Sequence, residues 1–473
     1  MLRDGSLNLR HPLSRSLNHL ALVTAILVML TSSFDTFLVL TAGGNYRFCQ
    51  LLVPILALLA ALRVKLRGLL PVLGASFLLI WLAFQAIFIP VSEFWPKSAG
   101  YCLWLLLNIV MICSFVQLFS DHFETLKILL QGYACSFGVI AAFGIIQFML
   151  PLLGYQAPFI TQWWIPNRFA RVSGFSYEPS YFATYLIIGF IFIGSLRRKH
   201  SKLLPRRAAT VLYFSTAAGI LVSSSRIGIF FLILDILITN LGVCIRSSRY
   251  LLKKSISRTE FHHLCRALLA IAALMVLSVL SFRFLEENPD TALLLLNGTG
   301  ISDSAAHSVL QRENAFEDTL AVFIEHPVMG QSLGGVSAAI ASLHGQTIRT
   351  FEDSKEFEGM NVFAEALAAS GILGVIPFIA FLVVTVRKPL TLTNLVHPFY
   401  ASTLRALVRS LVFAWAVLQF NQNLLRPYLW VHIGVLATVY AAALRSLTLA
   451  AKQHRAQPPL PEHDIPVAGN VPA

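Results

Sequence analysis

The sequence predicts an all-α polytopic membrane protein with about twelve transmembrane helices and one large helical loop on the outer face of the membrane. Three observations lead to this fold class. Of the 473 residues, 56% are hydrophobic. Only 12% are charged, and soluble domains carry about 25%. Apolar runs of about 20 residues, long enough to cross a bilayer, recur along the chain. This composition excludes a disordered chain and an ordinary soluble enzyme.

Apolar segments and the loops between them divide the chain into regions. Spans one to nine occupy residues 1–284, with an outer loop at 151–178. A long outer loop at 285–360 contains a helical pattern around 305–326. Spans ten to twelve lie within 361–451, and the proline-rich tail at 452–473 is expected to be disordered. The candidate spans lie near 17–34, 47–64, 69–90, 100–119, 126–150, 179–196, 209–225, 227–245, 266–284, 361–386, 404–421 and 428–446.

The loops between these spans sort by charge. The termini and the loops on their side of the membrane hold 26 of the 36 Lys and Arg residues, whereas 16 of the 23 acids lie on the other side. The positive-inside rule therefore places both termini, including the tail, in the cytoplasm. This rule also accounts for the net charge of +13, so we expect no nucleic-acid partner.

Cysteine and histidine residues give no sign of a metal site. The six cysteines lie in or beside apolar runs without a CxxC spacing, and we expect them to be small buried residues. His307, His326 and His344 share the outer loop but lack the short spacing of metal ligands. We therefore expect neither a metal nor another cofactor.

Several arginines fall on the outer side, where charge beside a membrane segment is costly and usually functional. They are Arg168, Arg171, Arg226, Arg312 and Arg426. Arginines that converge at one depth would form an anion site, because guanidinium groups bind phosphate oxygens in a bidentate manner. Arg168 and Arg426 are equally well explained as contacts to lipid headgroups.

Three acids in or beside spans have more than one explanation. Glu178 precedes Pro179 at an expected helix start, where it either serves a site or complements the helix dipole. Glu365 lies four residues after Asn361, on the same helix face, and either belongs to the site or pairs with a neighbouring arginine. Asp235, within the eighth span, has no evident partner.

Four stretches, in this order, resemble the O-antigen ligase and O-antigen polymerase superfamily. The first is 171–181 (RVSGFSYEPSY), which resembles the family's Arg–Gly–Pro stretch that opens a span. The second is 224–228 (SSRIG), similar to its Ser-Arg turn between two spans. The third runs from Arg312 to the HPVMG at 326–330, and the fourth contains Asn361, Gly371 and Gly374. With the expected topology, this set of short motifs is fairly specific.

The resemblance implies a membrane glycosyltransferase of the GT-C kind that works on the periplasmic face. Such enzymes use a glycan carried on undecaprenyl pyrophosphate. Polymerases transfer the growing glycan to another lipid-linked repeat unit, and ligases transfer it to lipid A core or to protein. Met360 stands where the ligase pattern has an important His before the Asn. The resemblance therefore favours a polymerase that makes exopolysaccharide or O-antigen.

Roles for individual residues follow from the same resemblance. Arg171, Arg226 and Arg312 would bind the pyrophosphate leaving group without metal, and Glu178 would accept the proton of the acceptor hydroxyl. The full set of expected catalytic residues is Glu178, Arg171 and Arg226. The expected substrate-binding residues are Arg168, Arg312, Tyr181, Ser225, Asn361 and Glu365.

The implied setting is the bacterial inner membrane. Expected partners are the undecaprenyl-pyrophosphate-linked oligosaccharide and the lipid bilayer, with a chain-length regulator and a flippase as further candidates. Two alternatives stay open. One is a ligase or related transferase that lacks the usual His, and the other is a transporter of the lipid-linked glycan. A transporter explains the long outer loop poorly, because many transporters are built from two matched halves and this loop has no counterpart in the first half.

Overall fold

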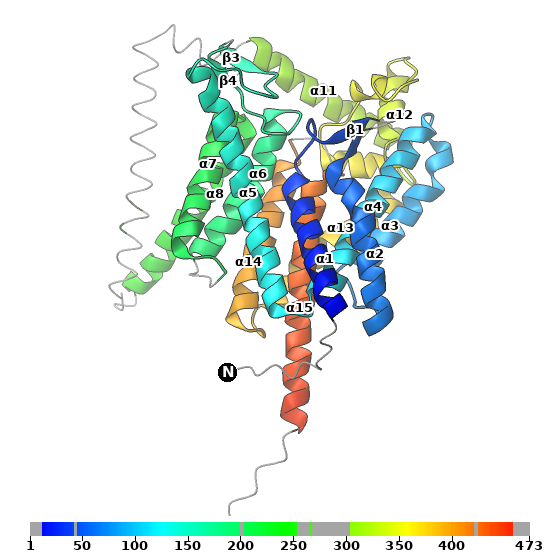
Figure 1. Cartoon of the computed structure of the whole chain (residues 1–473). Coiled ribbons are helices and arrows are strands. Elements are labelled where there is room, and N and C mark those ends of the chain that lie inside the picture. Colours follow the sequence, from blue (N-terminus) through cyan, green and yellow to red (C-terminus); the bar gives the residue numbers. More distant parts are fainter. Residues whose placement is uncertain are drawn as a thin grey trace, which may run out of the picture.

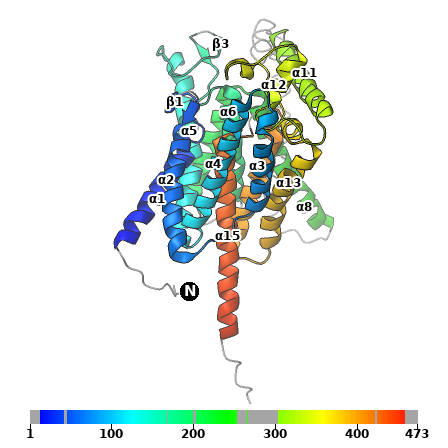
Figure 2. The ribbon, with the colours of Figure 1, turned by 90° about the vertical axis from the view of Figure 1, so that its right-hand side faces the viewer.

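The computed structural model describes residues 12–41, 45–165, 167–198, 203–252, 265, 268, 303–420 and 424–456. This part of the chain is mostly helical. Figure 1 shows an upright bundle of helices, with short strands and two helices across one end. That end, which carries β1, β3, β4, α11 and α12, is called the strand end below. The start of α1 and the end of α15 lie at the opposite end, called the terminal end (Figures 1 and 2).

The helices of the first part of the chain follow the expected spans closely. They are α1 (Pro12–Thr31), α2 (Phe48–Arg67), α3 (Ala75–Ile87), α4 (Trp95–Phe119), α5 (Phe123–Leu152), α6 (Pro179–Arg198), α7 (Arg206–Ser223) and α8 (Arg226–Leu252), with a 3-10 turn, η1 (Ile89–Val91). Two antiparallel pairs close the strand end, namely β1 (Val39–Thr41) with β2 (Asn45–Arg47), and β3 (Trp163–Ile165) with β4 (Phe169–Ala170).

The second part of the chain supplies the cover of the strand end and three long helices. Its elements are α11 (Asp303–Glu325), α12 (Val336–Leu343), a 3-10 turn η2 (Asp353–Lys355), α13 (Val362–Leu392), α14 (Pro398–Val417) and α15 (Pro427–Ala456). The pattern around 305–326 thus predicted α11 correctly. The tail expected to be disordered from Lys452 is helical as far as Ala456, and the rest of it lies outside the described residues.

Six of the described helices are long and apolar enough to cross a membrane: α2, α4, α5, α6, α13 and α15. Two shorter apolar helices lie at Ser16–Thr31 and Ala75–Val91. The class of helical membrane protein is therefore confirmed at this level, and the count of twelve is not. Helices α7, α8 and α14 occupy the places of expected spans but are not among these six. The expected ninth span, 266–284, lies outside the described residues.

Helix α6 forms the centre of the bundle. Every residue from Phe182 to Leu196 is buried, and α6 packs against α5, α7, α8 and α14. A helix that is apolar all round must be surrounded by other helices. Its first turn therefore lies at the middle of the strand end, where Glu178 and Tyr181 are placed.

Two sequence interpretations need correction. Asp235 has partners, because its carboxylate accepts a hydrogen bond from Arg409 at 2.6 Å and lies 3.8 Å from Arg198, in the last turn of α6. The pair joins α8 to α14 and α6, so Asp235 is structural. The cysteines are not all buried, because the side chains of Cys135 and Cys265 are exposed.

Helix α13 is broken at Gly371, and segment 327–335 forms hydrogen bonds with the helix backbone at this break. Gly371 has φ +60° and ψ −172°, a conformation essentially confined to glycine. The carbonyls of Pro327 and Val328 accept hydrogen bonds from the amides of Ile372 and Leu373, and Gln331 and Ser332 donate to Ala368 and Ala369. Segment 327–335 is thereby tied to a membrane-spanning helix.

Candidate functional site

The loop between β4 and α6 is held rigidly before it reaches the site. Gly174 has φ +60°, and its amide donates to Gln147 of α5 at 2.9 Å while its carbonyl accepts from the same side chain at 3.0 Å. The ring of Phe175 stacks on Phe143 with centroids 4.0 Å apart. Because both anchors lie on α5, Arg171 and Glu178 are presented from a fixed backbone.

Arg171, Arg226 and Arg312 come together around Glu178, although they lie on three different elements. Burial and the charge of Arg226 lower the pKa of Arg171, and Glu178 partly offsets this effect. Burial and the charge of Arg226 likewise lower the pKa of Arg312, again offset by Glu178 and by Tyr181. Among the described residues, the buried Nε atom of Arg171 has no hydrogen-bond partner. The charges of Arg226 and Glu178 act on both Arg171 and Arg312, and these groups together are called the arginine cluster.

Arg226 begins a helix, a position that suits an anion better than a cation. The turn before it is sharp, because Ser224 adopts the left-handed conformation with φ +56°. The Oγ atom of Ser225 accepts a hydrogen bond from the amide of Gly228 at 3.3 Å and so caps the helix. Ser225 therefore acts as a cap that positions Arg226. The Arg226 side chain and the N-terminus of α8 both add to the positive field of the cluster.

A second group of charges surrounds Tyr181, one turn into α6. Arg426 lies over the Tyr181 ring, with its Cζ 3.8 Å from the ring centroid. Asp35 forms ion pairs with Arg426 and, at 2.7 Å, with Arg47. Burial opposes ionisation of Asp35, but the two arginines and a hydrogen bond from the Tyr177 amide outweigh it and hold the pKa of Asp35 below its usual value. Arg426 is only 5% exposed, so it is not a lipid-headgroup contact.

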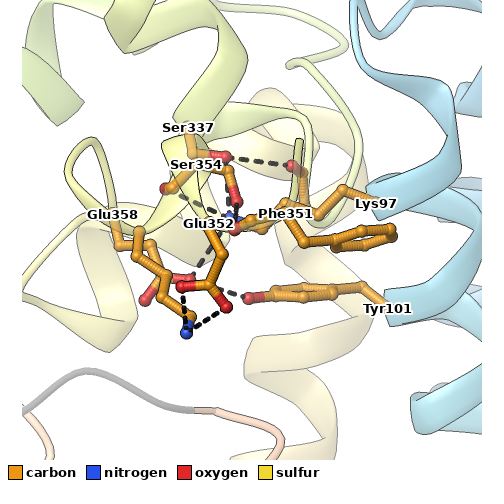
Figure 3. Close-up of polar contacts among 9 residues, drawn as sticks. Lys97, Tyr101, Ser337, Phe351, Glu352, Ser354 and Glu358 are labelled. Carbon is orange, nitrogen blue, oxygen red and sulfur yellow. Dashed lines mark hydrogen bonds and ion pairs between the residues drawn. The ribbon is translucent and has the colours of Figure 1, made fainter. Parts of the chain in front are cut away.

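A third group lies between α4 and the segment that follows α12 (Figure 3). Lys97 donates hydrogen bonds to Glu358 at 3.2 Å, to Ser337 at 2.9 Å and to the carbonyl of Ser354 at 3.4 Å. Tyr101, one turn further along α4, donates to Glu358 at 3.3 Å. The charge of Glu358 also acts on Tyr181, so this group borders the second one.

Asn361 and Glu365 open α13 next to the third group. The Oδ1 atom of Asn361 accepts hydrogen bonds from the amides of Phe363 and Ala364, both at 3.0 Å, and its Nδ2 donates to the carbonyl of Gln419 at 3.2 Å. Asn361 is thus a helix cap. Glu365 is half-buried, and its charge interacts with those of Glu358 and Lys97. No arginine pairs with it among the described residues, so the expected arginine pairing is not found there.

Arg168 is the one expected site residue that nothing ties to these groups in the described structure. Its side chain is exposed, and its Cζ lies 5.8 Å from the centroid of the Phe169 ring. The other expected residues all lie at the strand end, because α4, α6, α8, α13 and α15 all begin there.

Several polar residues at this site were not predicted from the sequence, namely Asp35, Arg47, Lys97, Tyr101 and Glu358. Their partners lie far away in the chain, for example 391 residues apart for Asp35 and Arg426. Asp35 and Lys97 do lie at the ends of apolar runs, where a charge is costly, and this was the signal that could have found them.

The groups that gather at the strand end are mainly arginines, carboxylates and tyrosines. In the described part of the chain, no three His, Cys, Asp or Glu side chains gather closely enough to hold a metal ion. The comparisons with known proteins add no assignment, since no protein-family model matches the chain and no curated protein matches it.

Proposed function

We propose that this protein is a polysaccharide polymerase of the inner membrane. It transfers a growing glycan from undecaprenyl pyrophosphate to another lipid-linked repeat unit. The observation that carries the proposal is the arginine cluster, in which the charge of Arg226 opposes, and that of Glu178 favours, the charges of both Arg171 and Arg312. A pyrophosphate would relieve the mutual repulsion of these cations, because guanidinium groups bind phosphate oxygens strongly. The order of the four family-like motifs supports the same reaction.

In this reaction, the arginine cluster stabilises the pyrophosphate leaving group. When the bond from the anomeric carbon to the pyrophosphate oxygen breaks, negative charge develops on that oxygen. Fixed cations at this point lower the barrier, and removal of one such group costs on the order of 10²–10³ in rate. The prenyl tail would stay in the bilayer beside the bundle while the pyrophosphate reaches the strand end.

The site residues take revised roles in this proposal. Arg171, Arg226 and Arg312 bind pyrophosphate, and Tyr181 contacts sugar hydroxyls. Glu178 lies within the arginine cluster and accepts a hydrogen bond from Ser180 at 3.0 Å, so we assign it to holding the arginines. Ser225 and Asn361 act as caps that position Arg226 and α13. Helices α11 and α12 cover the strand end and would exclude water, which suppresses hydrolysis of the donor.

The membrane topology belongs to the same proposal. We infer twelve crossings, with both termini in the cytoplasm and the strand end in the periplasm. The start of α1 and the end of α15 lie at one end of the bundle (Figure 1), as an even number of crossings requires. Arg63, Arg198 and Arg445 lie on helix segments at that end, as the positive-inside rule expects.

Two other functions would use the same cluster. A ligase would move the glycan to lipid A core or protein, and Met360 in place of the usual His argues against it. A transporter would only bind the pyrophosphate. At the terminal end, four of the described arginines, Arg63, Arg198, Arg409 and Arg445, pair with Asp121 or Asp235, so the charge of these four is already balanced.

A deletion strain separates these functions. Its surface and lipid-linked glycans are resolved on a gel, with and without a plasmid copy of the gene. A polymerase predicts single repeat units without polymer, a ligase predicts long polymer that stays on the lipid carrier, and a transporter predicts units trapped on the cytoplasmic side. Arg171→Ala and Arg226→Ala should fail to restore polymer, whereas Arg349→Ala, which removes an exposed arginine at the same end, should restore it.

A further inference from the structure

The acidic side chains of the strand end differ in whether they have a hydrogen-bonding or ion-pair partner. Five half-buried acids lie at this end of the described chain, and four have a partner. Asp35 pairs with Arg47 and Arg426, and Asp318 lies 3.0 Å from His344. Glu178 is held within the arginine cluster and by Ser180. Glu358 binds Lys97 and Tyr101.

The fifth acid, Glu365, is different. Among the described residues, its carboxylate has neither a hydrogen bond nor an ion pair. The nearest cation that acts on it is Lys97, whose ammonium already donates to Glu358, Ser337 and Ser354. Its other charged neighbour is the carboxylate of Glu358. A carboxylate beside another negative charge takes up a proton more readily than one paired with arginine.

Tyr181 and Tyr101 connect this acid to the arginine cluster. The charges that act on Tyr181 include those of Arg426, Glu178 and Glu358. Those that act on Tyr101 include Glu358, Glu365 and Arg426. Tyr181 therefore lies within electrostatic reach of both Arg312 of the arginine cluster and Glu358.

We propose that Glu365 accepts the proton of the acceptor hydroxyl, an assignment that rests on the proposed polymerase function. The acceptor oxygen forms a bond to the anomeric carbon of the donor sugar while its proton passes to the Glu365 carboxylate. The bond from that carbon to the pyrophosphate oxygen breaks, and its electron pair leaves with the undecaprenyl pyrophosphate, whose charge the arginine cluster balances. Lys97 and Tyr101 donate hydrogen bonds to Glu358, and this group lies next to Glu365. The acceptor is thus a sugar hydroxyl bound next to Glu365 and Glu358.

The test uses the full-length protein purified in lipid nanodiscs. Chain growth is measured on lipid-linked repeat units extracted from cells that lack the protein, and binding is measured with undecaprenyl pyrophosphate alone. Glu365→Gln should lower the rate of chain growth by about 10²–10⁴-fold, the usual contribution of a general base, and leave binding of undecaprenyl pyrophosphate unchanged. Glu356→Gln, an exposed acid in the same segment, is the matched control and should change neither quantity.

Chemical rescue distinguishes a proton acceptor from a structural residue. Added formate should restore part of the chain growth of Glu365→Ala, because a free carboxylate can take the same proton. The assignment is overturned if Glu365→Gln keeps chain growth, if it loses binding together with chain growth, or if formate gives no rescue. A wild-type protein that binds undecaprenyl pyrophosphate but never extends a glycan would instead refute the polymerase function, and this assignment would fall with it.

Discussion

Arginines at the strand end differ in how their charge is balanced. Asp35 lies between Arg47 and Arg426 and is itself buried to 6% side-chain exposure. The charges of Arg226 and Glu178 act on both Arg171 and Arg312. The first arrangement is a structural ion pair, whereas in the second the arginines repel one another. Buried groups whose pKa is shifted by a shared charged neighbour are typical of functional sites.

Removal of the Asp35 carboxylate should destabilise the strand end. We expect Asp35→Asn to lower the free energy of unfolding by about 3–5 kcal/mol, because it leaves the buried Arg426 without its partner. Thermal unfolding of the purified protein in detergent measures the change. Glu352→Gln breaks an exposed ion pair with Lys355 and is the control, for which little change is expected. Equal stability of the two variants would show that the Asp35 pair is not structural.

The ion pairs of Asp35 with Arg47 and Arg426 also predict that the free energy of unfolding decreases in acid. The pKa of Asp35 is lower in the folded state than its unfolded value of about 3.9. Its contribution to stability is therefore fully present above about pH 4 and is lost as the pH falls through the folded pKa. Unfolding midpoints measured from pH 6 to pH 3 should fall more steeply for the wild type than for Asp35→Asn. Parallel curves would contradict this role.

Among the helices, α13 connects a membrane span to the cover of the strand end. Its break at Gly371 lets the segment 327–335 hydrogen-bond to the helix, and Gly374 packs against Phe84. The spacing of these three residues thus has a structural reason. Asn361 caps α13, Gly371 forms the break, and Gly374 allows the close contact with Phe84. Because α12 follows this segment, the break also fixes the cover of the strand end.

A side chain at Gly371 should disrupt this junction. A Cβ there would lie 2.3 Å from the backbone of Val328, and φ +60° with ψ −172° disfavours any other residue. We expect Gly371→Ala to cost at least about 2 kcal/mol of stability and to abolish chain growth. Gly100→Ala, in α4 with no atom within 4 Å, should be neutral or slightly stabilising. Similar unfolding midpoints for the two variants would refute the role of the break.

The sequence predicted the helices better than the site. Long apolar runs locate helices because burial and hydrogen bonding act along the same segment, and α2, α4 and α6 lie close to their expected ranges. Arg171, Arg226 and Arg312 could be chosen because charge is rare in apolar surroundings. The pairing of Asp35 with Arg426 and of Lys97 with Glu358 could not, since it depends on packing between distant helices. The partner of Asp235 was missed for the same reason.

Over the whole molecule, the start of α1 and the end of α15 lie at the end of the bundle opposite to β1, β3, α11 and α12 (Figure 2). If twelve segments cross the membrane, the strand end is periplasmic. Single cysteines placed at exposed positions 349 and 168 in a cysteine-free chain should react with a membrane-impermeant maleimide in whole cells. A cysteine at exposed position 452, in the last helix, should react only after lysis. Labelling of position 452 in intact cells would contradict the topology.

The most direct measurement of the central claim is the affinity of the purified protein in nanodiscs for undecaprenyl pyrophosphate. The wild type should bind it more tightly than undecaprenyl phosphate. Arg226→Ala and Arg312→Ala should each weaken binding at least tenfold, about 1.4 kcal/mol, while Arg349→Ala should bind as the wild type does. If the cluster variants and the control bind equally well, the arginine cluster is not a pyrophosphate site.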